Sequence, residues 1–333
     1  MMLSTVVGIF MAVVTMFAII ANSLVFIVVC WNLSIKKPLN IFLFNLALAD
    51  IGVACTCIPY AVGQIAFKNQ GLTPTFCTVN SLVTTLFVGS SALIIAVFHF
   101  YQYLMVSGPL DSNVSSLHSC VSLILAWMVA ISLAIGPLFG WGKYEFSSTI
   151  FGCAFPQTIG TVERLVYNGT LMTVLYALPF LWMGFCCIAI SIHIRDPEVR
   201  AAKEHVLASD IVGHKSLEAG KSSGRSAIIL AFGAFVVFRA PFFISILLNT
   251  FNLVGQTWLT MADQIAFWAV YFHAASDPFL YALQHGEYTN TLGVIKRTTK
   301  ERFLDCCCCC TGNVEDGEKP GPSKPPLDRI EEE

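Results

Sequence analysis

Long runs of apolar residues, separated by short polar stretches, make up most of the chain. Each run is too long for a strand, and none alternates polar with apolar residues as the strands of a membrane barrel do. About 20 apolar residues let a helix cross a bilayer, where every backbone group must find its partner within the segment. The pattern predicts seven membrane-spanning helices, over residues 5–30, 39–62, 75–106, 119–139, 165–194, 224–251 and 258–283.

Composition supports a membrane protein and argues against other classes. The 333 residues are 56% hydrophobic and 12% charged, with a mean hydropathy of +0.70. Soluble domains contain about 25% charged residues, and a soluble chain of this size could not bury so much apolar surface. The net charge of −2 and the lack of a large basic patch argue against a nucleic-acid partner. We therefore expect an all-α, seven-transmembrane helix bundle surrounded by membrane lipid.

Basic residues predict the orientation of the bundle. Twelve Lys and Arg residues fall in one set of connections and three in the other, and basic loops stay in the cytoplasm. We expect a short extracellular amino terminus (1–4), a transmembrane domain (5–285) and a cytoplasmic carboxyl terminus, in a multi-pass plasma-membrane protein. The cytoplasmic set comprises Lys36, Lys37, six residues between 195 and 225, Lys296, Arg297, Lys300 and Arg302; the other set comprises Lys68, Lys143 and Arg164.

The segment after the seventh run has two distinct parts. Apolar or amphipathic residues recur at helical spacing within 286–305, with basic residues between them, which predicts an amphipathic eighth helix on an anionic membrane surface. The following cysteines suit palmitoylation, whereas five adjacent thiols without a histidine suit a metal ion poorly, so we expect no metal site. Residues 306–333 are predicted to be an acylated and disordered tail, with Cys306, Cys307, Cys308, Cys309 and Cys310 as the acylation sites.

Polar residues and prolines recur inside the runs, about one group per helix. They are Asn22, Asn45 to Asp50 (Asn-Leu-Ala-Leu-Ala-Asp), Trp127, Pro137, Pro179, Pro241 and Asp277 to Tyr281 (Asp-Pro-Phe-Leu-Tyr). In this order, and with Cys77 opening the third helix, they resemble the rhodopsin-like family of G-protein-coupled receptors over about residues 5–305. The resemblance implies a signalling receptor and not an enzyme.

The resemblance implies several sites. Cys77 and Cys153, which are the two cysteines expected outside, would form the disulfide of the second outer loop. Asp50, Ser91 and Asp277 would line a small site for a sodium ion or a shared proton, or would brace the helices through water. A mainly apolar pocket for a small-molecule ligand would be built by Thr84, Thr85, Val88, Arg239, Phe242, Phe243, Ile246, Phe267 and Tyr271.

The chain departs from the family at its switch residues. The transducer switch comprises Tyr101, Gln102, Tyr103 and Tyr281, and Gln102 stands where the family has an Arg that enters the G protein. Coupling to a heterotrimeric G protein or arrestin is therefore expected to be weak or atypical.

Helix 6 reads Phe-Arg-Ala-Pro in place of Cys-Trp-x-Pro, which puts Arg239 at bilayer depth. Arg239 would pair with Asp277 first or Asp50 second, or it would anchor an anionic ligand.

The segment Pro137 to Tyr144, followed by Cys153, is similar to an outer loop of opsins. Retinal needs a helix 7 lysine seven residues before the proline, and Tyr271 occupies that position, so we expect no Schiff-base retinal and no cofactor beyond a possible sodium ion. Two other functions stay open: a non-signalling seven-helix scaffold or partner subunit, and an ion- or proton-coupled transporter, which lacks visible inverted repeats.

Overall fold

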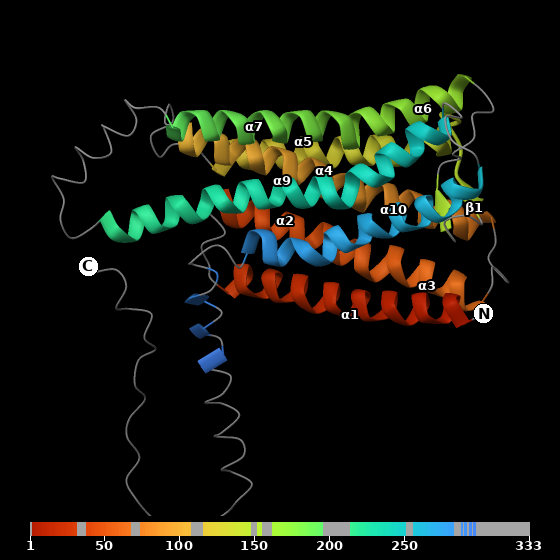
Figure 1. Cartoon of the computed structure of the whole chain (residues 1–333), viewed down its shortest axis with the longest axis horizontal. Helices are drawn as coiled ribbons and strands as arrows, with labels where there is room; N and C mark the ends of the chain where they lie inside the picture. Colours follow the sequence, from red (N-terminus) through yellow and green to blue (C-terminus); the bar gives the residue numbers. More distant parts are fainter. Residues whose placement is uncertain are drawn as a thin grey trace, which may run out of the picture. The chain divides into compact units, whose positions relative to one another are not determined.

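A computed structural model describes residues 2–31, 38–67, 74–107, 116–147, 152–154, 162–195, 214–250 and 256–282, with single residues between 288 and 297. All seven predicted runs are helical, and the helices lie side by side (Figure 1). In chain order they are α1 (Met2–Trp31), α2 (Pro38–Gly52) with η1 (Val53–Cys57) and α3 (Ile58–Phe67), α4 (Pro74–Ser107), α5 (Ser116–Ile135) with η2 (Gly136–Phe139), α6 (Val162–Met172) with η3 (Thr173–Ala177) and α7 (Leu178–Arg195), α9 (His214–Thr250), and α10 (Gln256–Asp277) with η4 (Pro278–Ala282).

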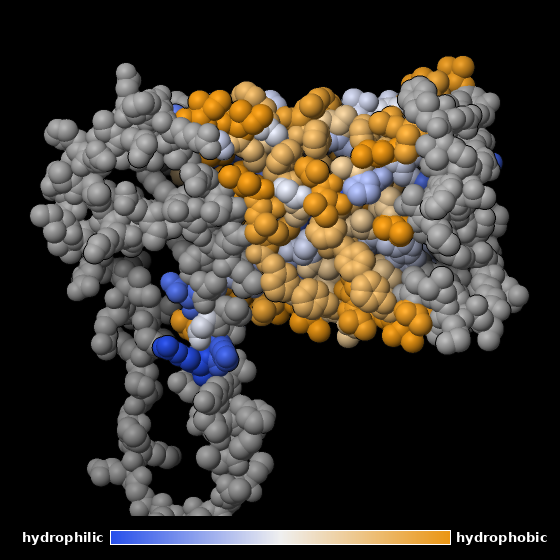
Figure 2. Space-filling model, viewed as in Figure 1, coloured by the Kyte–Doolittle hydropathy of each residue, from blue (hydrophilic) through white to orange (hydrophobic). Residues whose placement is uncertain are grey.

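The outer faces of the helices suit a lipid environment. Figure 2 shows apolar side chains gathered along the sides of the helices, and Ile20, Ile124 and Ile188 are 62%, 61% and 62% exposed. Six helices in the described residues are long and apolar enough to cross a membrane. The seventh predicted span, α10, is not among these six, and it packs against both α1 and α9.

Three π-helical turns interrupt the helices near prolines. A proline removes a backbone donor, and its ring clashes with the carbonyl four residues earlier, so a wider turn relieves the clash. Turn η1 ends just before Pro59, η3 ends just before Pro179, and η4 begins at Pro278. Tyr176, which lies within η3, is buried against the aromatic rings of α9. The wider turn therefore positions an aromatic side chain at the site described below.

A short hairpin between α5 and α6 is the one departure from the all-α prediction in the described residues. Strand β1 (Glu145–Ser147) pairs antiparallel with β2 (Gly152–Ala154). The chain turns toward the hairpin at Gly140 and Gly142, both with φ of +86°, where a side chain would be strained. A Cβ at Gly142 would also meet the ring of Tyr167. We call the end of the bundle that carries these strands the hairpin end (Figure 1).

The segment beyond α10 is described only in part. Residues up to Thr291 form one compact unit, and Leu292–Glu333 form another. Tyr288 is buried and helical, and single residues after it are helical, but the predicted eighth helix over 286–305 is not described as a continuous element. The predicted acylation sites Cys306–Cys310 and the rest of the tail lie outside the described residues. The domain boundaries therefore stay predictions.

Candidate ligand cavity and buried polar cluster

A cavity lies between α4, the α6–η3 segment, α9 and α10. It encloses about 520 Å³ of empty space, including its open mouth. Aliphatic and aromatic side chains form most of its wall, and hydroxyl groups supply its polar points. Its lining comprises Ser81, Thr84, Thr85, Val88, Gly89, Leu171, Met172, Leu175, Tyr176, Phe242, Phe267, Val270 and Tyr271.

The structure brings six of the nine predicted pocket residues to this cavity and leaves three out. The six are Thr84, Thr85, Val88, Phe242, Phe267 and Tyr271. Phe243 stacks against Tyr176 from α9, with ring centroids 6.4 Å apart, and Ile246 is buried in the apolar core. Arg239 does not line the cavity, because its guanidinium points toward the backbone of α4 at Val88.

The sequence did not single out the residues that complete the wall. Ser81 and Gly89 lie four residues from Thr85 on either side, so the helical period places all three on one face of α4. That spacing could have found them. Tyr176 was missed because it lies in the π-helical turn η3, which Pro179 marks but whose effect on side-chain direction the sequence does not give.

The polar points of the cavity are uncharged. Among the described residues, no Asp, Glu, Lys, Arg or His side chain is part of the lining. The hydroxyl oxygen of Ser81 is buried and has no hydrogen-bond partner in the described part of the chain. The hydroxyl of Thr84 is also buried and lies beside the side chains of Tyr271 and Cys57. Because a buried hydroxyl without a partner is unfavourable, the Ser81 hydroxyl is available to a bound molecule.

The hairpin end is tied to the bundle by tyrosine hydroxyls. Tyr144 donates a hydrogen bond to the carbonyl of Ala134 at 2.8 Å, and its oxygen lies 3.3 Å from both Thr85 Oγ1 and Tyr167 Oη. Tyr167 donates to the carbonyl of Leu133 at 2.8 Å. Burial raises the pKa of Tyr144, so its hydroxyl remains protonated at neutral pH and above. The loop before β1 is therefore anchored beside the cavity.

Both predicted disulfide residues belong to this region. Cys77 opens α4 and is disulfide-bonded. Cys153 lies in β2, opposite Phe146, and β2 contacts α4. The side chain of Cys153 lies outside the described residues, so the pairing of these two cysteines stays a prediction.

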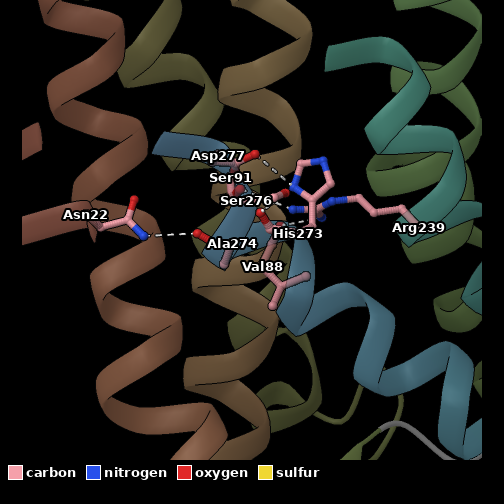
Figure 3. Close-up of polar contacts among 8 residues, drawn as sticks. All are labelled: Asn22, Val88, Ser91, Arg239, His273, Ala274, Ser276 and Asp277. Atoms are coloured by element: carbon pink, nitrogen blue, oxygen red, sulfur yellow. Dashed lines mark hydrogen bonds and ion pairs between the residues drawn. The ribbon is translucent and has the colours of Figure 1, made fainter. Parts of the chain in front are cut away.

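Below the cavity, Arg239 enters the core from α9 (Figure 3). Its side chain is only 2% exposed. Nη1 donates to the carbonyl of Val88 at 3.1 Å, and Nη2 donates to Ser91 Oγ at 3.1 Å. The guanidinium carbon also lies 5.5 Å from the ring centroid of Phe235, at cation–π distance. Arg239 therefore joins α9 to α4 at the level just beneath the ligand cavity.

The predicted ion pair between Arg239 and Asp277 or Asp50 is not formed. The guanidinium finds its acceptors on α4, where a carbonyl and a hydroxyl three residues apart match its two terminal nitrogens. Asp277 Oδ1 instead lies 3.3 Å from Nδ1 of His273, which stands four residues earlier on α10. Sequence reasoning missed His273, although an i,i+4 spacing on a helix could have indicated the contact.

The predicted trio of Asp50, Ser91 and Asp277 does come together. Asp50 from α2 and Asp277 from α10 are 0% and 1% exposed. Their carboxyl groups lie close enough to interact directly, with Ser91 beside Asp50, and the charge of Arg239 acts on both carboxyls. Asn22 of α1 also reaches this region, donating to the carbonyl of Ala274 at 2.9 Å. Five helices thus meet at one buried polar cluster, namely α1, α2, α4, α9 and α10.

The family model described as "7 transmembrane receptor (rhodopsin family)" matches residues 21–281. The chain belongs to the rhodopsin family of seven-transmembrane receptors.

Relatives within the rhodopsin family are distant in sequence. A rhodopsin of Enteroctopus dofleini is 24% identical over 327 residues, which cover 93% of this chain and 68% of that protein. A rhodopsin of Mizuhopecten yessoensis, named as Gq-coupled, is 22% identical over 297 residues, which cover 86% of this chain and 58% of that protein. The crystal structure of squid rhodopsin superposes with a TM-score of 0.77 at 20% identity, covering 94% of this chain and 88% of that one. The last match shows a shared fold.

Within this rhodopsin-family bundle, the switch residues occupy the end opposite the hairpin. Tyr101, Gln102 and Tyr103 are partly buried near the end of α4. The ring of Tyr101 lies 5.4 Å from that of Phe42 on α2, and the ring of Tyr103 lies 6.0 Å from that of Phe185 on α7. Tyr281 belongs to η4, but its side chain lies outside the described residues.

A histidine that sequence reasoning missed joins α4 to α9 near this end. His99 is fully buried; its Nδ1 lies 2.8 Å from the carbonyl of Ile95, and its Nε2 lies 3.3 Å from the carbonyl of Ile228 on α9. The thiol of Cys187 on α7 points at the same carbonyl, at 3.9 Å. The Ile228 carbonyl of α9 is therefore contacted by side chains from two neighbouring helices, α4 and α7.

Proposed function

We propose that this rhodopsin-family chain is a plasma-membrane receptor that binds a small, uncharged ligand without a covalent bond. The cavity between α4, η3, α9 and α10 carries the proposal, because its lining combines aromatic walls, several hydroxyls and no ionisable acid or base. Tyr271 stands in this wall at the position predicted for the retinal-binding lysine, so a Schiff base cannot form there. A mainly apolar site with few polar points is typical of small-molecule sites.

The hydroxyls of the lining indicate the chemistry of the ligand. Ser81 and Thr84 stand three residues apart on α4, and both line the cavity. A carbonyl, ether or hydroxyl group of the ligand would hydrogen-bond to the Ser81 hydroxyl. A charged ligand would find no counter-ion in the lining and would lose its hydration without compensation.

Thermal stability of the purified receptor tests this proposal. A panel of neutral, cationic and anionic small molecules is screened for a rise in Tm, and the neutral compounds are expected to supply the stabilising ones. The double variant Ser81→Ala/Thr84→Val keeps the cavity shape and should weaken binding of ligands with a hydrogen-bonding group. Ser132→Ala, on the exposed face of α5, serves as the matched control. Stabilisation by charged compounds alone would overturn the proposal.

For signalling, we propose weak coupling to a heterotrimeric G protein or arrestin. The proposal rests on Gln102. Its side chain is a neutral amide, whereas the resemblance implies an Arg, with its permanently charged guanidinium, at this position. The same residue favours the second candidate function, a seven-helix scaffold or partner subunit that does not signal. Cyclic-nucleotide and calcium assays of transfected cells without added ligand separate the two, because a receptor shows basal activity above that of mock-transfected cells and a scaffold shows none.

The covalent features and topology belong to the same proposal. The amino terminus lies outside, a Cys77–Cys153 disulfide holds the hairpin loop, and Cys306–Cys310 carry thioester-linked acyl chains. Non-reduced peptide mapping tests the disulfide, and two alkylated thiols at those positions would contradict it. Protease protection of an epitope at each end of the chain tests the topology.

A further inference from the structure

The buried polar cluster of Asp50, Ser91 and Asp277 does not fit the sodium ion predicted for it. A sodium ion needs several oxygen ligands, and the hydroxyl of Ser91 already accepts a hydrogen bond from Arg239 Nη2 at 3.1 Å. The same guanidinium acts electrostatically on both carboxyl groups. A second cation placed among these oxygens would stand beside a fixed positive charge, and burial would strengthen their repulsion.

We propose that Arg239 is the resident cation of this cluster and that the protein does not bind sodium there. A guanidinium keeps its charge at every accessible pH, so it supplies a permanent positive charge where other chains would need a soluble ion. The side chain is 2% exposed, and the carboxyls of Asp50 and Asp277 are the carboxylic acids on which its charge acts within the described residues. Val88 and Ser91 hold the head group in place from α4.

The geometry distinguishes this role from that of a ligand anchor. The two terminal nitrogens of Arg239 donate to groups on α4, and the side chain is not part of the cavity wall. Figure 3 shows the guanidinium extending from α9 toward Ser91 and His273. The cation is covalently part of α9, so the cluster is complete at any ionic composition. This inference does not depend on which ligand the cavity binds.

Thermal unfolding in two salts tests the inference. The full-length protein, purified in lipid nanodiscs, is melted in sodium chloride and in choline chloride at equal ionic strength. We expect the wild-type curves to superimpose. Arg239→Gln keeps a donor side chain but removes the charge, and its Tm should rise with sodium concentration and not with choline. Asp277→Asn added to that variant should abolish the rise, and Arg239→Lys, which retains a charge, should remain insensitive to sodium.

Two results would overturn the inference: a sodium-specific rise in the Tm of the wild-type protein, or a folded Arg239→Gln protein with no sodium response. If Arg239→Gln does not accumulate, the wild type and Arg239→Lys still decide the question through the sodium NMR line width. Broadening by the wild-type protein that Asp50→Asn removes would show a bound ion and refute a resident guanidinium. Line widths equal to those of empty nanodiscs would support it.

Discussion

Removing the hydroxyl of Tyr144 should loosen the loop that borders the cavity. The hydroxyl donates to the carbonyl of Ala134 at 2.8 Å. α5 ends at Ile135, and the last four carbonyls of a helix lack intrahelical donors. Tyr144→Phe therefore leaves the Ala134 carbonyl without its hydrogen-bond donor, and the helix itself supplies no replacement.

The size of the effect follows from that geometry. A typical hydrogen bond contributes about 0.5–1.5 kcal/mol net, and a buried acceptor left without a donor costs about 1–3 kcal/mol. We expect Tyr144→Phe to lower the free energy of unfolding by about 1–3 kcal/mol. Tyr167→Phe should cost a similar amount, because Tyr167 caps the carbonyl of Leu133 in the same way. The two hydroxyls lie 3.3 Å apart, so the double variant should lose less than the sum.

Denaturant titration in mixed micelles measures these losses. Tyr101→Phe is the matched control, since Tyr101 packs its ring against Phe42 and its hydroxyl makes none of the hydrogen bonds observed in the described residues. A Tyr144→Phe protein within about 0.5 kcal/mol of the wild type, which is the range of unremarkable surface substitutions, would refute the capping argument. Strictly additive losses would show that the two tyrosines act separately.

Four further outcomes are expected. Gln102→Arg should raise basal or ligand-stimulated signalling. No change in any transducer assay would show that Gln102 is not the cause of the proposed weak coupling. Asn22→Ala should destabilise the protein by about 1 kcal/mol or more in the same titration, because it removes the donor to the Ala274 carbonyl that joins α1 to α10. Folding raises the pKa of Tyr144 above its usual value of about 10, so the stability it contributes is complete below about pH 10 and is lost as pH rises further; alkaline melting curves of Tyr144→Phe should show a smaller loss. Replacing Cys306–Cys310 with Ser should remove hydroxylamine-sensitive acyl labelling, and unchanged labelling would move the acylation site.

The helices could be predicted because their signal is long and redundant. A run such as 75–106 offers about thirty apolar positions, and α4 extends over Pro74–Ser107. The hairpin offered no such signal. Each of its strands has three residues, which is too short for alternation to be recognised. Its position depends instead on Gly140, Gly142 and the tyrosine caps, which act through contacts distant in sequence.

The polar cluster shows where sequence reasoning ends. The depth of Arg239 along α9 could be read from its distance to Pro241, and Asp50 and Asp277 were predicted as its partners. The partner could not be read, because a long flexible side chain reaches acceptors on several helices. A backbone carbonyl, such as that of Val88, is present at every residue and leaves no trace in the sequence. The direct ion pair was therefore expected where a carbonyl and a hydroxyl in fact receive the guanidinium.

The two ties between α4 and α9 differ in strength, and the difference bears on how the helices can separate. At the level of Arg239 a charged group donates two hydrogen bonds to α4, whereas near the end opposite the hairpin His99 makes one contact of 3.3 Å with the carbonyl of Ile228. Of these two ties, a swing of α9 pivoting at Arg239 breaks only the weaker one, together with the contact between the Cys187 thiol and the same carbonyl. A neutral hydrogen bond is worth about 1 kcal/mol net, or roughly a fivefold bias in population between closed and open arrangements. The polar contact of His99 therefore adds only a shallow preference for the closed arrangement at that end, and a modest difference in ligand affinity between the two arrangements is enough to offset that contribution.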